Sequence, residues 1–280
     1  MMKRMLLAST SVIVLATSAM AADLTPPPVL PPPPPLWTGF YIGINAGYEW
    51  ENSQSVDVRT VPVAADPAFA ALANANLHSK QDGFIGGGQI GYNYQFGNSW
   101  VVGLEADIDG LAASHTTESV ATFGTVGGAS VTTGISASKN IDYLGTVRGR
   151  IGYLVTPTLL VFGDGGLAYG GVGTGLSVVQ TSDTGLLGVA AGYPRTNAQV
   201  GWTAGGGVEW MFMPNWSAKV EYLYYDLGTV TNSSFLNAVS ASPLVSYAWS
   251  QAKAQYTGNV VRVGINYHFN WGAPPVVAKY

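Results

Sequence analysis

Eight segments of this 280-residue chain alternate between apolar residues and small or polar ones, and this alternation constrains the fold more than any other feature. In the first segment, for example, Ile42 and Ile44 alternate with Gly43 and Asn45. Successive side chains of a strand point to opposite faces, so the pattern predicts strands with one apolar face. The eight segments are 40–49, 84–96, 100–108, 143–153, 159–169, 202–212, 216–224 and 261–269.

The links between these segments are alternately long and short. The short links lie at 97–98, 156–157 and 214–215, and the long links at 51–81, 113–140, 172–198 and 229–257. This order is typical of transmembrane barrels, which have tight turns on one side and long loops on the other. We therefore expect an all-β fold, an eight-stranded antiparallel transmembrane up-and-down β-barrel with long external loops and short periplasmic turns. An even number of strands places both termini in the periplasm.

The composition agrees with strands in lipid. Charged residues make up 10% of the chain, whereas soluble domains usually have about 25%. After the N-terminal region, no apolar run is long enough for a membrane-spanning helix. Aromatic residues gather at both ends of the predicted strands, as expected at the two membrane interfaces and not in a soluble β-sandwich. One belt faces the short turns and comprises Phe40, Tyr94, Phe96, Trp100, Tyr153, Phe212, Trp216, Tyr267 and Phe269. The other faces the long links and comprises Tyr48, Phe84, Tyr143, Tyr169, Trp202, Tyr222 and Tyr224.

The N-terminal region predicts export. Lys3 and Arg4 precede an apolar stretch at 6–18, and Ala19-Met20-Ala21 matches a cleavage site, so residues 1–21 form a predicted signal peptide. A membrane anchor is the alternative, but the stretch is shorter than the roughly 18 residues that a spanning helix needs. We assign 22–36 to a Pro-rich periplasmic arm, 37–269 to the barrel and 270–280 to a periplasmic tail. The predicted location is the outer membrane of a Gram-negative cell.

Charged residues of the predicted strands fall on the inward register, and none falls on the outward one. The predicted lumen charge network is Glu105, Asp107, Arg148, Arg150, Asp164, Glu209, Lys219, Glu221 and Arg262, with Glu49 and Asp109 on the same register. An eight-stranded barrel is just wide enough for side chains to fill its interior, and buried charges must pair. The network is therefore interpreted as a polar plug, with a narrow or gated ion path as the alternative.

Several function classes find little support. Without Lys3 and Arg4, the 12 basic residues become 10 against 16 acidic ones, so nucleic acid is not an expected partner. No cysteine is present, and the three histidines, His78, His115 and His268, are too scattered to predict a metal or catalytic site. The glycine pattern at 86–91 matches a dinucleotide motif, but it runs into a strand and not into a helix. No cofactor and no enzymatic activity are expected, although a membrane-edge hydrolase remains a third hypothesis.

A family resemblance supports this interpretation. The segment 37–48 resembles the first strand of the small porin-like outer-membrane barrels of alpha-proteobacteria, which are related to the OmpA transmembrane domain, and 86–94, 103–109, 147–153 and 263–269 resemble further family strands. The end of the last strand, with Tyr267 and Phe269, resembles the signal read by the barrel assembly machinery. The resemblance implies a structural, surface-exposed protein that maintains envelope integrity.

The leading hypothesis is therefore a non-enzymatic structural barrel with recognition loops, and the alternative is a narrow diffusion channel through the charged lumen. Expected partners are outer-membrane lipid, lipopolysaccharide and the assembly machinery. Host or phage surfaces are candidates for contact with the loops. In the first of these loops, Asp66-Pro67 predicts a capped helical turn.

Overall fold

The computed structural model of this protein describes residues 36–115, 117–183, 185–192, 197–238 and 247–269. The predicted signal peptide, the C-terminal tail and all of the Pro-rich arm except Leu36 lie outside these ranges. Within the described ranges, no helix is long and apolar enough to cross a membrane.

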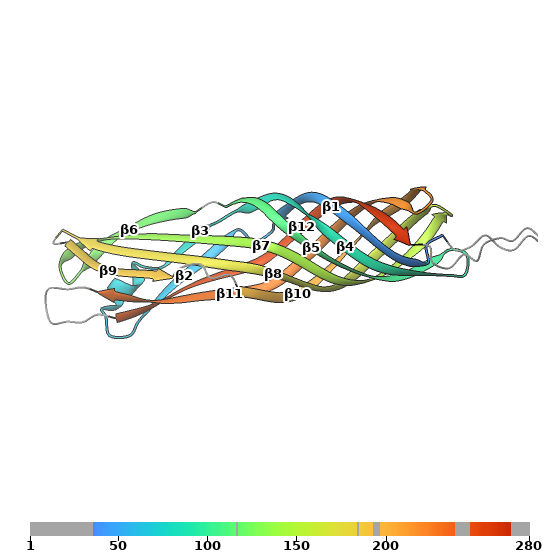
Figure 1. The fold of residues 1–280 in the computed structure, drawn as a ribbon. Helices are drawn as coiled ribbons and strands as arrows, with labels where there is room; N and C mark the ends of the chain where they lie inside the picture. Colours follow the sequence, from blue (N-terminus) through green and yellow to red (C-terminus); the bar gives the residue numbers. More distant parts are fainter. Residues whose placement is uncertain (1–35, 116, 184, 193–196, 239–246, 270–280) are drawn as a thin grey trace, which may run out of the picture. The chain divides into compact units, whose positions relative to one another are not determined.

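Eight long strands form a closed antiparallel ring, as the alternation predicted (Figure 1). Each strand pairs with the next in chain order, and the last strand returns to pair with the first. All eight alternating segments lie within these strands. The ring consists of β1 (Gly39–Glu51), β4 (Gln81–Phe96), β5 (Trp100–His115), β7 (Ala129–Thr156), β8 (Leu159–Ser182), β10 (Asn197–Met213), β11 (Trp216–Ala238) and β12 (Tyr247–Phe269).

The three short turns lie where the sequence predicted them, and we call this end of the ring the short-turn end. Gly97 has a φ of 55° in the turn between β4 and β5, and Asn215 has a φ of 72° in the turn between β10 and β11. Glycine and asparagine are the residues that adopt this left-handed region most readily. The turn residues therefore fix tight reversals that keep neighbouring strands in register.

The four long connections differ from the prediction, because they are largely β structure and not loops. They contain β2 (Ser55–Pro62), β3 (Ala75–His78), β6 (Glu118–Val126) and β9 (Gly185–Gly192), and β7, β8, β11 and β12 continue into the same region. We call these parts together the extension. Its Ser, Thr and Val residues also alternate in burial, as in the outer part of β7, and Thr and Val favour strands.

The predicted helical turn is present in the extension as α1 (Pro67–Ala71). The Asp66 carboxylate accepts a hydrogen bond from the backbone N–H of Ala68, and a proline begins the helix. Phe69 and Ala70 are buried, and the backbone oxygen of Phe69 accepts a hydrogen bond from the Gln180 side chain of β8. The turn therefore packs into the interior of the extension.

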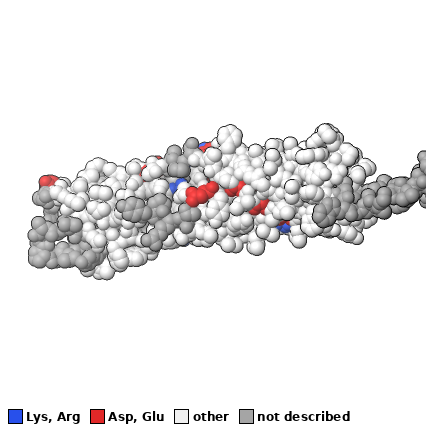
Figure 2. Space-filling view, viewed as in Figure 1, with Lys and Arg blue, Asp and Glu red and all other residues white. Residues whose placement is uncertain are grey.

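Over the eight alternating segments, the outward face of the ring is apolar and the charged side chains point inward. Ile44 at the middle of β1 is 70% exposed, and Leu104 of β5 is 66% exposed. Figure 2 shows that acidic and basic atoms occupy little of the visible face. The outward register thus matches the lipid-facing surface that the sequence predicted, and the two aromatic belts lie at its ends.

Candidate functional site

The nine side chains of the predicted lumen charge network come together inside the ring. They belong to β5, β7, β8, β10, β11 and β12, and the side chains that form the ion pairs are at most 3% exposed. Asp109 joins the same network through Arg262, at 2.6 Å. Alternation in each strand points these residues to the common axis, and we keep the name lumen charge network for the ten residues together.

Arg148 lies at the centre of this network. Its Nη2 is 2.5 Å from Glu105 and 2.9 Å from Asp107, and its Nη1 is 2.6 Å from Asp164 and 2.8 Å from Glu221. A guanidinium has five N–H donors in a planar fork, so it can pair with several carboxylates at once. One arginine therefore ties together three strands besides its own.

The other three cations complete the pairing. Arg262 contacts Asp107 at 2.9 Å and Glu221 at 2.7 Å, Lys219 contacts Glu105 at 2.7 Å, and Arg150 contacts Glu209 at 2.7 Å. Charge-assisted hydrogen bonds of this kind are stronger than neutral ones. The lumen is filled with paired charge, and such pairing fixes side chains that would otherwise line a water path.

Neutral polar residues that the sequence analysis missed also belong to the network. The Tyr41 hydroxyl donates to Glu105 over 2.6 Å, the Thr146 hydroxyl donates to Asp107 over 2.6 Å, and Ser217 donates to Glu209 over 2.6 Å. All of them lie on the inward register, and this position is the sequence feature from which they could have been predicted. They add hydrogen bonds to carboxylates that the four cations also contact, such as the Asp107 oxygen that Arg148 and Arg262 share.

Ser217, His268 and Glu209 lie close together but do not form a catalytic triad. The Nε2 atom of His268 is 2.9 Å from the Ser217 hydroxyl and also 3.4 Å from Glu209. A triad needs the acid on the other ring nitrogen, so that Nε2 is free to take the serine proton. These side chains are also at most 2% exposed. The arrangement is that of a structural hydrogen-bond cluster.

An apolar layer closes the short-turn end of the lumen. Trp37 is fully buried just before β1, and its indole N–H donates to the backbone oxygen of Pro157 over 3.0 Å. Its ring lies edge-on to His268 at 5.7 Å. The layer comprises Trp37, Val101, Leu154, Leu160, Phe162 and Met211. The alternating pattern could not reveal Trp37, because this residue precedes the first strand.

A second apolar layer lies on the other side of the lumen charge network and continues into the extension. The inward register becomes mainly apolar there. Leu223 follows Glu221 in β11, and the Tyr225 hydroxyl donates to the buried Glu49 carboxylate over 2.6 Å. Ile85, Leu144 and Val260 belong to the same buried cluster. Apolar side chains at native packing density leave little space for water. The lumen charge network is therefore enclosed between two largely apolar layers.

A buried ion pair lies beyond the aromatic belt at the extension end. Lys139 Nζ is 3.0 Å from Glu51, and it donates to the backbone oxygens of Ser53 and Gln255 over 2.7 and 2.6 Å. Burial lowers the pKa of Lys139, whereas the Glu51 carboxylate acts in the opposite direction. The pair ties the extension to the end of β1.

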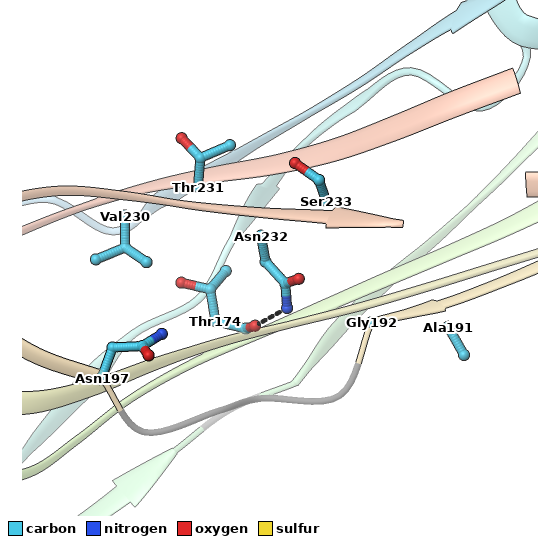
Figure 3. Close-up of a pocket in the computed structure, with 8 residues that line it drawn as sticks. All are labelled: Thr174, Ala191, Gly192, Asn197, Val230, Thr231, Asn232 and Ser233. Atoms are coloured by element: carbon cyan, nitrogen blue, oxygen red, sulfur yellow. Dashed lines mark hydrogen bonds between the residues drawn. The ribbon is translucent and has the colours of Figure 1, made fainter. Parts of the chain in front are cut away.

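The extension also holds a cavity of about 400 Å³ between β8, β9, β10 and β11. Within it, the Asn232 side chain donates to the backbone oxygen of Thr174 (Figure 3). The lining residues that the structure describes are uncharged, and their polar groups are hydroxyl, amide and backbone groups. Its lining residues are Thr174, Ala191, Gly192, Asn197, Val230, Thr231, Asn232 and Ser233.

The glycine motif and the histidines, for which the sequence predicted no binding site, have structural roles. The glycines at 86–91 lie inside β4, and a Cβ at Gly91 would lie 2.4 Å from the Tyr41 hydroxyl oxygen, so this glycine makes room for a network residue. His78 lies on β3 in the extension, whereas His268 lies near the short-turn end of β12. Among the described residues, no group of three or more His, Asp or Glu side chains is arranged to hold a metal ion.

Comparisons of sequence identify the relatives of this chain. The family model described as "outer membrane protein beta-barrel domain" matches residues 8–269. The "31 kDa outer-membrane immunogenic protein" of Brucella melitensis is 36% identical over 234 residues, which cover 83% of this chain and 84% of that protein. An uncharacterized protein of Coxiella burnetii is 26% identical over 241 residues, covering 83% and 82% of the two chains.

Comparisons of structure find outer-membrane barrels as well. OprG from Pseudomonas aeruginosa aligns over 83% of this chain and 97% of its own, with 11% identity and a TM-score of 0.38. Neisserial surface protein A aligns over 83% and 98% of the two chains, with 9% identity and a TM-score of 0.33.

Proposed function

Because this chain belongs to the outer membrane protein β-barrel family, and thus to the Gram-negative outer membrane, we propose that it is a non-enzymatic structural barrel with a closed lumen. Its extension presents a surface for recognition outside the cell. The observation that carries the proposal is the enclosure of the lumen charge network between two apolar layers. Paired charges between apolar layers hold the strands together and would leave no continuous water path.

The proposed orientation places the short-turn end, and with it both termini, in the periplasm. Barrels of the outer membrane have short periplasmic turns and longer external connections. The extension would then stand outside the membrane, where it would contact host or phage surfaces. Its relative from Brucella melitensis is described as an immunogenic protein, which supports a surface position for this chain too.

The lipid-facing surface gives a direct test by charge substitution. Ile44→Arg puts a charge at the middle of β1, and we expect it to lower the free energy of unfolding by about 2–4 kcal/mol. Phe123→Arg is the matched control, because Phe123 is 73% exposed, against 70% for Ile44, but lies on β6 in the extension. The control is expected to change stability by at most about 0.5 kcal/mol.

Both variants are measured by urea unfolding in lipid vesicles. Equal effects of the two substitutions would contradict a membrane span that is limited to the ring.

The second candidate function is a narrow diffusion channel, which the charged lumen favours. Planar-bilayer recording separates the two. For the purified folded protein we expect no reproducible single-channel steps, since ions would have to cross two apolar layers. The preparation must show heat-modifiable migration on a gel, so that an absence of single-channel steps is not caused by unfolded protein. Reproducible steps altered by Arg148→Ala or Glu105→Ala, but not by exposed Arg59→Ala, would establish the channel instead.

A further inference from the structure

The outward face of the extension carries a shallow groove that the closed barrel does not explain. The groove has a volume of about 440 Å³ and lies across β2, β12 and β11, which pair side by side. Its lining residues are Asp57, Arg59, Thr231, Gln251 and Lys253. In the described part of the extension it therefore combines two cations, one carboxylate, an amide and a hydroxyl on neighbouring strands.

The strand register fixes how these groups meet. Gln251 of β12 lies opposite Arg59 of β2, and Lys253 lies opposite both Asp57 of β2 and Thr231 of β11. Arg59 is 78% exposed in its side chain, and its Nε donates to Asp57 over 2.9 Å. This bond orients the guanidinium and leaves its two Nη groups available. Lys253 is exposed and takes part in none of the ion pairs found among the described residues.

An aromatic pair stands at one end of the groove. Trp249 lies two residues from Gln251 on β12, and its ring meets that of Phe235 edge-on, with the centroids 4.2 Å apart. Phe235 is 52% exposed, and Val61, opposite Trp249 on β2, is 57% exposed. Together they form an apolar patch next to polar groups, which is typical of a binding surface.

These features suit one chemical class. A sugar ring has an apolar C–H face that can lie against an aromatic side chain, and hydroxyls that bond to amide and carboxylate groups. Arginine and lysine recognise a phosphate or carboxylate on that sugar. We propose that this groove binds an acidic saccharide through Arg59 and Lys253, with the aromatic pair against the sugar ring.

The position of the groove points to the lipopolysaccharide of the same leaflet as the source of this sugar. This step rests on the orientation proposed above. The groove faces away from the barrel axis. It lies partly on β12, whose outward residues nearer the short-turn end, such as Val261 and Val263, face lipid. Lys253 lies eight residues from Val261 along β12, or roughly 26 Å of strand. Neighbouring lipopolysaccharide molecules therefore present their core sugars, with phosphate and carboxylate groups, to this face.

The test uses the full-length mature protein in nanodiscs that contain no lipopolysaccharide. Its probe is water-soluble core oligosaccharide released from lipid A. The double variant Arg59→Ala/Lys253→Ala is expected to weaken binding by about tenfold. Lys80→Ala is the matched control, because Lys80 is also an exposed lysine of the chain but pairs with Asp82 outside the groove. Unchanged melting of all variants shows that the exposed substitutions leave the fold intact.

Each outcome tests one step of the proposal: the site, the anionic chemistry, the source of the sugar or the orientation. Equal binding by the double variant and the wild type overturns the site, and equal binding of dephosphorylated, carboxyl-reduced core oligosaccharide overturns the anionic chemistry. Binding of a sulfated host-type glycan without binding of the core overturns the assigned source. Ser233→Cys tests the orientation separately, since its labelling on intact cells by an impermeant maleimide is expected. Failure of labelling would refute the orientation without affecting the binding measured in nanodiscs.

Discussion

Replacing Arg148 by methionine is expected to lower the free energy of unfolding by about 3–5 kcal/mol, the usual cost of removing one partner from a buried ion pair. Four carboxylates, those of Glu105, Asp107, Asp164 and Glu221, lie within 2.9 Å of the guanidinium. Methionine keeps much of the side-chain volume, so the loss of stability measures the removal of the charge and not the creation of a cavity. Lys219 and Arg262 still contact the other three carboxylates, but Asp164 loses the one cation that it contacts among the described residues.

Unfolding in urea, followed by tryptophan fluorescence in detergent micelles or vesicles, measures the effect. Arg59→Met is the control, because Arg59 also pairs with an aspartate but is 78% exposed in its side chain, and exposed pairs contribute at most about 1 kcal/mol. A loss of less than about 1 kcal/mol in the Arg148 variant would show that the lumen is hydrated enough to screen its charges.

A rescue experiment separates charge imbalance from lost geometry. Adding Asp164→Asn and Glu221→Gln to the Arg148→Met variant neutralises two of the four carboxylates that Arg148 contacts and keeps the side-chain shapes. If unpaired charge causes the loss, the triple variant should be more stable than Arg148→Met alone. If it is less stable, the hydrogen-bond geometry of the network matters more than its charge balance.

The register of the ring and the members of its charge network could be predicted because a strand has a period of two. A slip of one residue would turn every charged side chain toward lipid, so only one register is compatible with the sequence. For this reason Glu105 and Arg148 could be placed in one lumen from strands that are far apart in the chain. Their individual partners could not be predicted, since pairing depends on the stagger between strands, which the alternation does not contain.

Two features escaped prediction for different physical reasons. The long links between the alternating segments predict loops, but their Thr and Val residues have partners in the neighbouring long strands, as Val131 of β7 does opposite Ser182 of β8. Strand propensity depends on such partners, which a single sequence does not reveal. The burial of Trp37 at the closed end of the lumen could not be predicted. It depends on residues of β7, β8 and β10 at the short-turn end, and no local sequence pattern reports those contacts.

The largest effect in cells is expected at the end of β12. Alanine at both Tyr267 and Phe269 should remove most of the folded protein from the outer membrane, if this strand end is the signal for the barrel assembly machinery. Tyr267 packs against Trp216 and Phe269 with centroids 5.1 and 5.0 Å apart. These contacts are peripheral, so the variant should still refold into detergent micelles in vitro. The expected result is thus a failure of assembly and not of stability.

Tyr94→Ala is the matched control for this prediction. Tyr94 belongs to the same aromatic belt and is 53% exposed on β4, so it shares the interfacial position but not the terminal strand. Both variants are compared by the heat-modifiable band in outer-membrane fractions and by refolding yield in micelles. An equal loss in both variants would assign the aromatics to membrane anchoring alone. A loss confined to the β12 variant, with normal refolding in vitro, would mean that an internal Phe269, followed by 11 further residues up to Tyr280, still serves as a recognition signal.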